Sequence, residues 1–308
     1  MDLLSDVVQV MHVEGKVLCR WQVSAPHGAW FPSGDFMFFH LVSEGSLLLG
    51  SSGEERILEA GDVLLVTSGE RHQLTDLAGT SPLFIGEIVR QFQDDSGLIR
   101  YGGPESETAQ GVSGMFKIRN GAGVHPLFQV LPNVLLVNLN DAESTWLKTT
   151  FELYIRELAS RQPGHQAVIS RLTDVLFVQL VRAWVASQEG QAAAGWLGAA
   201  RDPDIGRSLQ LIHQQPAVAW GLEDLAGQVG MSRSTFAARF SELVGEPPMQ
   251  YASRWRLNVA AGLLLEPHLR VSEVADQVGY RSLSSFTRAF TRAYGQAPGK
   301  WRKQGNAS

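Results

Sequence analysis

The sequence predicts an α+β protein of several domains: an N-terminal β-barrel, a helical linker, and an all-α C-terminal region with two helix-turn-helix motifs. Three observations predict this fold class. Short apolar runs alternate with Gly, Ser, Asp and Pro clusters over the first 140 residues, helical apolar spacing follows, and one helical pattern occurs twice between Leu225 and Trp301. We expect the domains to span 1–140, 141–203 and 204–308.

The N-terminal apolar runs have the length and the punctuation of β-strands. They are Phe36 to Val42, Ser46 to Leu49, Val63 to Val66 and Val134 to Leu139. Each run is short and is bounded by turn-forming residues, as the strands of a small barrel or sandwich are. A barrel of this kind can enclose a small molecule.

The middle of the chain has apolar residues at helical spacing. Thr145 to Ala159 and His165 to Ala186 are the predicted helices, and Pro163 and Gly164 mark the break between them. The second helix either packs within the chain or forms a dimer interface, and both interpretations explain its apolar residues. Residues 187–204, rich in Gln, Ala and Gly, form the predicted linker.

The C-terminal repeat has the pattern of a helix-turn-helix. In the first copy Gly230 ends a short helix, Ser232 caps the next helix, and Phe236 and Phe240 share the buried face of that second helix. The corresponding residues of the second copy are Gly279, Ser282, Phe286 and Phe290. Two copies predict two helices that each expose one face.

A further helix is predicted between the two copies, over residues 248–265. At the usual helical rise it is about 27 Å long, which is comparable to one turn of B-DNA, about 34 Å. Trp255, Val259 and Leu263 are its predicted buried stripe. Two recognition helices held at this separation fit successive major grooves on one face of a duplex.

The formal net charge of −5 hides an asymmetry. Residues 201–308 hold thirteen Lys and Arg against nine Asp and Glu, a balance of +4, so residues 1–200 carry −9. The repeated end is therefore the basic end. This excess is compatible with phosphate contacts, although charge alone does not establish nucleic-acid binding.

The composition favours a reducing, cytoplasmic setting. Cys19 is the one cysteine, which excludes an internal disulfide and a cysteine-rich zinc site. The start of the chain is acidic where a secretory signal has basic residues. The most apolar stretch, 168–186, is interrupted by Arg171, Asp174 and Arg182, so no membrane span is expected.

The C-terminal hundred residues resemble the AraC/XylS family of bacterial transcription regulators. Two segments carry the resemblance: LAGQVGMSRSTFAARFSELVGEPPMQYASRWRLNVAAGLLL and VSEVADQVGYRSLSSFTRAFTRAYGQAPGKWRK. The resemblance implies a cytoplasmic bacterial protein that binds double-stranded promoter DNA and responds to a small molecule in its N-terminal domain. It also implies contact with RNA polymerase if the protein is an activator, and it favours a homodimer.

The N-terminal region resembles the cupin-type sensor domain attached to such regulators. Gly61, Asp62, Gly69 and His72 in GDVLLVTSGERH carry the motif, and Thr67 stands where the pattern usually has Pro. Cupin enzymes have a His-X-His with a downstream carboxylate, whereas this chain has His40 followed by Leu and Val. We therefore expect no metal, no cofactor and no catalytic activity.

The predicted DNA contacts lie on the faces opposite the paired phenylalanines. Advancing 100° per residue places Ser234, Ala237, Ala238 and Ser241 outward in the first motif. The second motif presents Leu283, Ser284, Thr287, Arg288 and Thr291. Arg288 can donate two hydrogen bonds to guanine, whereas Ala238, at the corresponding position, offers at most a contact to a thymine methyl. Phosphate contacts or solvated positions are expected for Arg233, Arg239, Arg281 and Arg292.

The predicted effector-binding residues are aromatic and histidine side chains of the β-domain. They are Trp30, Phe38, His40, His72 and His125. Trp21 and Phe36 could also line a pocket, although aromatic side chains in a small barrel are usually core. Two other interpretations remain open: His40 and His72 bond within the fold, or the β-domain is only a dimerisation or partner-binding scaffold. A third, a cupin metalloenzyme, lacks a complete set of ligands. Walker, G-x-S-x-G and G-x-G-x-x-G motifs are absent from the sequence.

Overall fold

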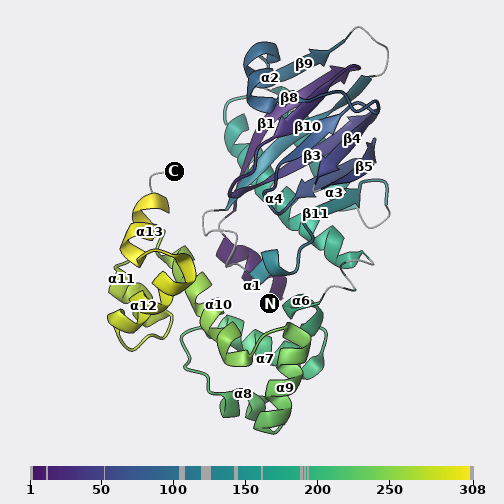
Figure 1. Ribbon diagram of the computed structural model, residues 1–308. Helices are drawn as coiled ribbons and strands as arrows, with labels where there is room; N and C mark the ends of the chain where they lie inside the picture. Colours follow the sequence, from purple (N-terminus) through teal and green to yellow (C-terminus); the bar gives the residue numbers. More distant parts are fainter. Residues whose placement is uncertain are drawn as a thin grey trace. The chain divides into compact units, whose positions relative to one another are not determined.

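The chain divides into two compact units in the computed structural model (Figure 1). The structure describes residues 3–11, 13–51, 53–103, 108–118, 126–141, 145–160, 162–187, 190, 192 and 194–305. The β-unit comprises the described residues of 13–118 and 131–190. The helical unit comprises those of 1–12, 119–130 and 191–308.

The β-unit is built from strands that form two sheets. The strands are β1 (Val13–Ser24), β2 (Gly28–Phe31), β3 (Phe36–Glu44), β4 (Ser46–Ser51), β5 (Glu54–Glu59), β6 (Asp62–Val66), β7 (His72–Thr75), β8 (Leu83–Phe84), β9 (Leu98–Gly102), β10 (Thr108–Ile118) and β11 (Val134–Asn138). Among the described residues, one sheet has the order β11-β6-β3-β10-β1-β9 and the other β5-β4-β7-β2-β8. The four apolar runs expected to be strands are confirmed as β3, β4, β6 and β11.

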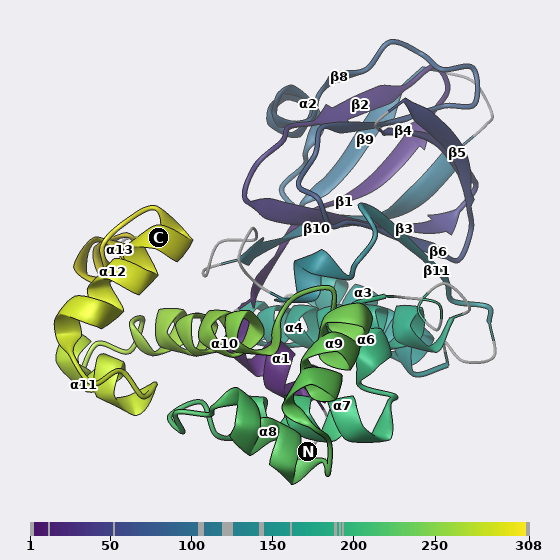
Figure 2. The same ribbon diagram turned by 60° about the horizontal axis from the view of Figure 1, so that its bottom comes forward.

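The two sheets lie face to face, as Figure 2 shows, and the described strands do not close into one continuous ring. Side chains from both inner faces form the core, with Phe38, Val42, Leu47 and Leu64 among its buried members. Alternation sets the inner face: β4 buries every second residue, whereas the central strand β6 is buried throughout. The predicted β-domain is therefore confirmed with a sandwich-like arrangement.

The turn between β6 and β7 explains why Thr67 replaces the usual proline. Its backbone N–H donates to the carbonyl of Asn133 over 2.9 Å, and its hydroxyl donates to the carbonyl of Pro132. Proline has neither donor, so threonine joins this turn to the segment before β11. Gly69 follows in the left-handed region, where a Cβ would lie 2.2 Å from the carbonyl oxygen of Gly34.

Among the described residues, the β-unit also contains the helices α2 (Ile85–Phe92), α3 (Thr145–Ser160) and α4 (His165–Ala186). The bounds of α3 and α4 confirm both helices predicted for the middle of the chain. Gly164, at φ +85°, lies between them, and α4 packs against α3 and β1. The Thr173 hydroxyl lies 3.3 Å from the Tyr154 hydroxyl across the α3–α4 contact.

The helical unit contains only helices and connections among its described residues. They are α1 (Leu3–Met11), the 3-10 helix η2 (Pro126–Gln129), α6 (Trp196–Ala199), α7 (Pro203–Gln214), α8 (Leu222–Gln228), α9 (Arg233–Val244), α10 (Pro248–Leu263), α11 (Val271–Gln277), α12 (Leu283–Tyr294) and α13 (Pro298–Gly305). The all-α C-terminal region is therefore confirmed.

Two parts of the helical unit come from outside the region predicted to bind DNA. Helix α1 packs against α7 and α10, and its Leu3 and Val7 are buried. The predicted linker contains α6, whose Trp196 is 2% exposed. The domain limits at residues 140 and 203 stay predictions.

Candidate functional sites

The first helix-turn-helix consists of α8 and α9. Gly230 adopts φ +68° after α8, and the Ser232 hydroxyl accepts the backbone N–H of Thr235 over 3.2 Å at the start of α9. Phe236 and Phe240 are fully buried, with ring centroids 5.6 Å apart. The cap fixes where α9 begins, and the two rings fix which face turns inward.

The second helix-turn-helix, α11 and α12, repeats this geometry. Gly279 adopts φ +81°, and the Ser282 hydroxyl accepts the backbone N–H of Ser285 over 3.2 Å. Phe286 and Phe290 are fully buried, and their ring centroids also lie 5.6 Å apart. The predicted turns, caps and buried faces are confirmed in both copies.

Helix α10 joins the two motifs. Trp255 is buried against His213 of α7, with ring centroids 3.8 Å apart, while Val259 and Leu263 are partly buried against the core of the second motif. The helix contains 16 residues, about 24 Å at the usual rise. It is two residues shorter than the predicted span and stays close to one turn of B-DNA, about 34 Å.

The faces of α9 and α12 opposite the phenylalanines are open to solvent. Ser234 and Ala238 are exposed on α9, and Ala237 and Ser241 are half-buried. On α12 the exposed side chains are those of Leu283, Ser284, Arg288 and Thr291, with Thr287 half-buried. Both sets of predicted base-facing residues are therefore presented together at the surface of their helix.

The predicted phosphate-binding arginines differ in their partners. Arg239 donates to Asp202 over 2.5 Å and lies 3.5 Å from Asp204, so its guanidinium is engaged within the helical unit. Arg233 lies 3.7 Å from Glu223, and both side chains are largely exposed. By contrast, Arg281, Arg288 and Arg292 are exposed and form no ion pair with the described residues. Unpaired arginines are concentrated in the second motif.

The two motifs also differ in net charge. Residues 221–247 hold two arginines against four acidic residues, whereas residues 270–304 hold seven Lys and Arg against two acidic residues. One motif is therefore weakly acidic and the other strongly basic. Attraction to a phosphate backbone is expected to be stronger at the second motif.

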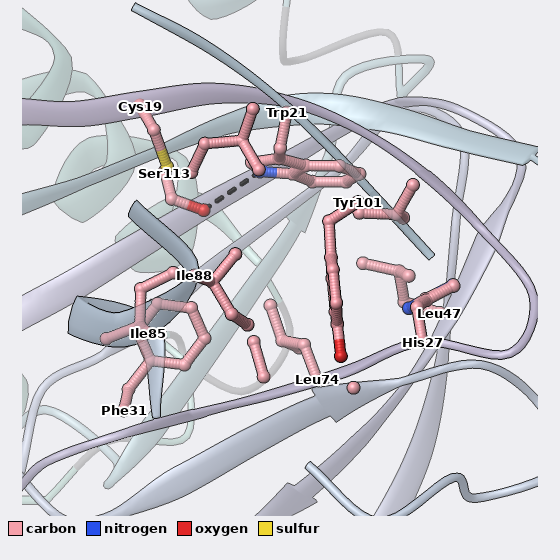
Figure 3. A pocket seen from close by; sticks show the side chains of 14 residues that line it. Cys19, Trp21, His27, Phe31, Leu47, Leu74, Ile85, Ile88, Tyr101 and Ser113 are labelled. Carbon is pink, nitrogen blue, oxygen red and sulfur yellow. Dashed lines mark hydrogen bonds between the residues drawn. The ribbon is translucent and has the colours of Figure 1, made fainter. Parts of the chain in front are cut away.

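A cavity lies between the two sheets of the β-unit, next to α2 (Figure 3). Its empty space, with the mouth and open solvent included, is about 440 Å³. Most of its lining is apolar, and its polar members are few. The lining residues are Cys19, Trp21, Val23, His27, Gly28, Ala29, Phe31, Leu47, Leu74, Ile85, Ile88, Ile99, Tyr101 and Ser113.

A chain of buried hydrogen bonds starts in this cavity. The indole N–H of Trp21 donates to the Ser113 hydroxyl over 2.9 Å, a bond drawn in Figure 3. Ser113 Oγ lies 2.8 Å from His40 Nδ1, and His40 Nε2 lies 2.9 Å from His72 Nε2. His72 Nδ1 lies 3.2 Å from the carbonyl oxygen of Glu70. Polar groups of four strands and a turn are thus connected inside an apolar core.

Burial keeps both histidines neutral. It lowers the pKa of His72 to about 4, and it lowers the pKa of His40 well below its usual value. The ring of Phe31 stacks on His72 with centroids 4.8 Å apart, and Phe38 lies beside both imidazoles. The surrounding aromatic side chains keep water away from both imidazoles. A positive charge there would lose its hydration, and this loss is the largest cause of both lowered pKa values.

The predicted effector residues that the structure describes do not line the cavity. Trp30 points to the other side of β2, where the Arg71 guanidinium lies 4.3 Å from its ring centroid. Phe38 is part of the core, and His40 reaches the cavity only through Ser113. His72 contributes to a depression that Glu54 and Glu55 also line. His125 lies outside the described residues.

Most of the lining residues were not predicted from the sequence; Trp21, one of the aromatic side chains expected at a pocket, is the exception. Cys19, Trp21 and Val23 alternate along β1, as residues that share one face of a strand do. Ser113 on β10 and Tyr101 on β9 have no comparable signal, because pairing between distant strands brings them to the cavity.

The described residues contain no group of three or more His, Cys, Asp and Glu side chains arranged to hold a metal ion. In the same part of the chain, no helix has the length and apolar character needed to cross a membrane.

Comparisons with known proteins agree with this two-part architecture. A cupin family model matches residues 2–186, and a helix-turn-helix domain model matches residues 225–304. The HTH-type transcriptional regulator AlkR of Acinetobacter baylyi is 27% identical, and the match covers 99% of this chain and all of that protein. A putative AraC-like transcription regulator of Streptomyces lividans is 28% identical, with 98% of each chain covered.

A third relative is the RCS-specific HTH-type transcriptional activator RclR of Escherichia coli K12. It is 28% identical over 92% of this chain and 89% of its own length. The fold and the exposed paired helices thus define a protein with a cupin domain followed by a DNA-binding domain. The chain belongs to the cupin family. It is a DNA-binding transcription regulator of the AraC type, and its relatives are named as regulators and not as enzymes.

Proposed function

We propose that the chain reads promoter DNA with α9 and α12 and that the second motif provides most of the hydrogen-bonded base recognition. The observation that carries this proposal is the contrast between Arg288 and Ala238, both exposed at the same place in two matching helices. A bidentate arginine–guanine contact contributes about 1–3 kcal/mol of discrimination. Ala238 has no polar side-chain atom, so the first motif contributes positioning and methyl contacts.

The remaining exposed residues divide by chemistry. Base edges are assigned to Ser234 and Ala237 on α9, and on α12 to Leu283, Ser284, Thr287 and Thr291. Phosphates are assigned to Arg233, Arg281 and Arg292. Arg239 is assigned a structural role instead, because its ion pairs with Asp202 and Asp204 hold α9 against the start of α7.

The readout assignment is tested by titrating the full chain with its preferred DNA sequence and with single-base variants of that sequence. Arg288→Ala is expected to relax the preference at one base pair by about tenfold. Arg56→Ala, which removes an exposed arginine of β5, is the matched control and keeps the full preference. If Arg288→Ala weakens all sequences equally, Arg288 contacts phosphate and the assignment is wrong.

We further propose that the cavity of the β-unit holds a small-molecule effector. Its support is the apolar lining with few polar groups, the usual character of ligand sites. The cavity makes it a weaker interpretation that the β-domain is only a dimerisation or partner-binding scaffold, because such a scaffold needs no internal space. Contact with RNA polymerase and a homodimer through α4 remain part of the proposal by family analogy, and the site of action is the bacterial cytoplasm.

The effector proposal is tested by closing the cavity. Cys19 is 3% exposed and lines the space, so Cys19→Phe fills it with a side chain that matches the surrounding apolar groups. A folded Cys19→Phe protein is expected to keep DNA binding and to lose its transcriptional response in cells. A variant that still responds fully would place the effector elsewhere.

We propose that the three expected domains have separate functions. Residues 1–140 supply the sensor, apart from α1, which packs in the helical unit. Residues 141–203 supply the connecting helices, and residues 204–308 supply the DNA-binding domain.

A further inference from the structure

The hydrogen-bond chain from the cavity has one consistent direction. The carbonyl of Glu70 can only accept, so the hydrogen of neutral His72 is on Nδ1 and its Nε2 is a bare acceptor. His40 Nε2 must then donate to His72, which leaves His40 Nδ1 bare. The Ser113 hydroxyl therefore donates its hydrogen to His40.

This direction requires that both imidazoles are neutral. The outward charged groups near His72 are Glu54, Glu55 and Arg71, which line the same depression. On the inner side, the contacts described for the pair are Ser113 and aromatic rings. A proton added to His72 would place two N–H groups against each other and would force His40 to reverse.

The direction of these hydrogen bonds determines whether Ser113 can donate or accept a hydrogen bond inside the cavity. A serine hydroxyl has one hydrogen and two acceptor positions. The hydrogen goes to His40 and one acceptor position is taken by the Trp21 N–H, so one lone pair is left. Ser113 can accept a hydrogen bond from a ligand, but it cannot donate one.

We propose that Ser113 is the polar anchor of the cavity and that the cavity selects an uncharged, mostly apolar ligand carrying a hydrogen-bond donor, such as an alcohol or a phenol. This inference rests on the proposed effector function of the cavity. The lining contains no Lys or Arg among the described residues, and burial lowers the pKa of His27, so a carboxylate would enter without a counter-charge and would meet the lone pair of Ser113. An ether would leave that lone pair unsatisfied.

The tautomers are tested without a ligand. Nitrogen-15 spectra of the full chain at pH 7, with each imidazole connected to its backbone signals, report which ring nitrogen carries the hydrogen. The expected result is a neutral His72 protonated at Nδ1 and a neutral His40 protonated at Nε2. A charged ring, or the opposite tautomer of His40, would overturn the inference because Ser113 would then be free to donate.

The ligand class is tested with probes of matched size, followed by the change in tryptophan fluorescence on binding. The probes are 3-phenyl-1-propanol, its isomer 2-phenylethyl methyl ether, and 3-phenylpropanoate. The alcohol is expected to bind about tenfold more tightly than the ether, because it forms one more hydrogen bond. The carboxylate is expected to bind most weakly of the three.

Two variants separate the possible outcomes. Ser113→Ala is expected to abolish the difference between the alcohol and the ether, whereas Ser170→Ala, an exposed serine of α4, keeps it. Equal binding of the alcohol and the ether to the wild-type chain, or a preference that survives Ser113→Ala, overturns the role of Ser113. If none of the probes binds, the effector cavity itself is contradicted, whatever tautomers the spectra report.

Discussion

At the scale of single residues, the neutral histidine pair couples stability to pH. The pKa of His72 is about 4 in the folded chain and 6.5 in the reference state. Between these values the unfolded chain binds more protons than the folded chain, so the free energy of unfolding falls as the pH decreases. This contribution is fully present above pH 6.5 and is lost as the pH falls toward 4.

The corresponding prediction concerns His72→Gln. Urea unfolding of the wild-type chain is expected to lose about 2 kcal/mol between pH 7 and pH 4.5 through this group. His72→Gln cannot take up the proton, so its free energy of unfolding changes less over the same interval. Equal pH dependence of the two proteins would show that His72 is already charged or is accessible to water in the folded chain.

The roles of single residues could be predicted from the sequence where neighbouring residues alone determine the local conformation. Gly230, Ser232 and the paired phenylalanines follow helix-capping and helix-face rules that need only neighbouring residues. Trp30 and Phe31 illustrate the opposite case. Adjacent residues of a strand point to opposite sheet faces, and only the pairing of β2 with β7 determines which of the two faces the cavity.

At the scale of elements, the two motifs share a scaffold and differ in charge. Helices α9 and α12 begin at serine caps and end at glycines in the left-handed region, Gly245 and Gly295. Residues 221–247 and 270–304, which contain these helices, carry net charges of opposite sign. The second motif is therefore expected to supply more of the salt-sensitive affinity for DNA.

Salt dependence provides the test at this scale. Replacing Arg281 and Arg292 together by Gln is expected to reduce the slope of log affinity against log salt by about 2, one for each lost phosphate contact. Arg239→Gln is the control, because Arg239 is already paired with Asp202 and should leave the slope nearly unchanged. A larger effect of Arg239→Gln than of the double change would contradict the proposed division between the motifs.

Most elements were predictable because their apolar residues recur with a clear period. The bounds of α4, for example, match the predicted span of His165 to Ala186. Helix α1 was missed because nine residues offer too little periodicity, and its packing against α7 and α10 depends on contacts with the far end of the sequence. Ser113 was missed for the same reason, since strand pairing places it beside His40.

At the scale of the whole molecule, the first helix belongs to the unit that contains both helix-turn-helix motifs. Val7 is fully buried in α1, which packs against α10, the helix that joins the motifs. Residue 13 then begins β1, a strand that lines the cavity. The chain is thus continuous between the cavity lining and a helix of the DNA-binding unit.

Because Val7 is fully buried, we expect its replacement to destabilise the folded chain, and a charged residue to do so more than a small apolar one. Val7→Ala is expected to lower the free energy of unfolding by about 1–2 kcal/mol, and Val7→Asp by about 3 kcal/mol or more, because a buried charge lacks a partner. Chemical unfolding followed by tryptophan fluorescence gives both values. If Val7→Asp is as stable as the wild-type chain, α1 does not pack in the helical unit.

We propose that one scaffold is used twice and that hydrogen-bonded base recognition is concentrated in the second copy. Selection from a randomised DNA library tests it most directly, using the wild-type chain, Arg288→Ala and Ala238→Arg. Arg288→Ala is expected to lose the strongest guanine preference, and Ala238→Arg is expected to gain a new one about one helical turn, roughly 10 base pairs, away. A guanine preference that survives Arg288→Ala unchanged would contradict the claim.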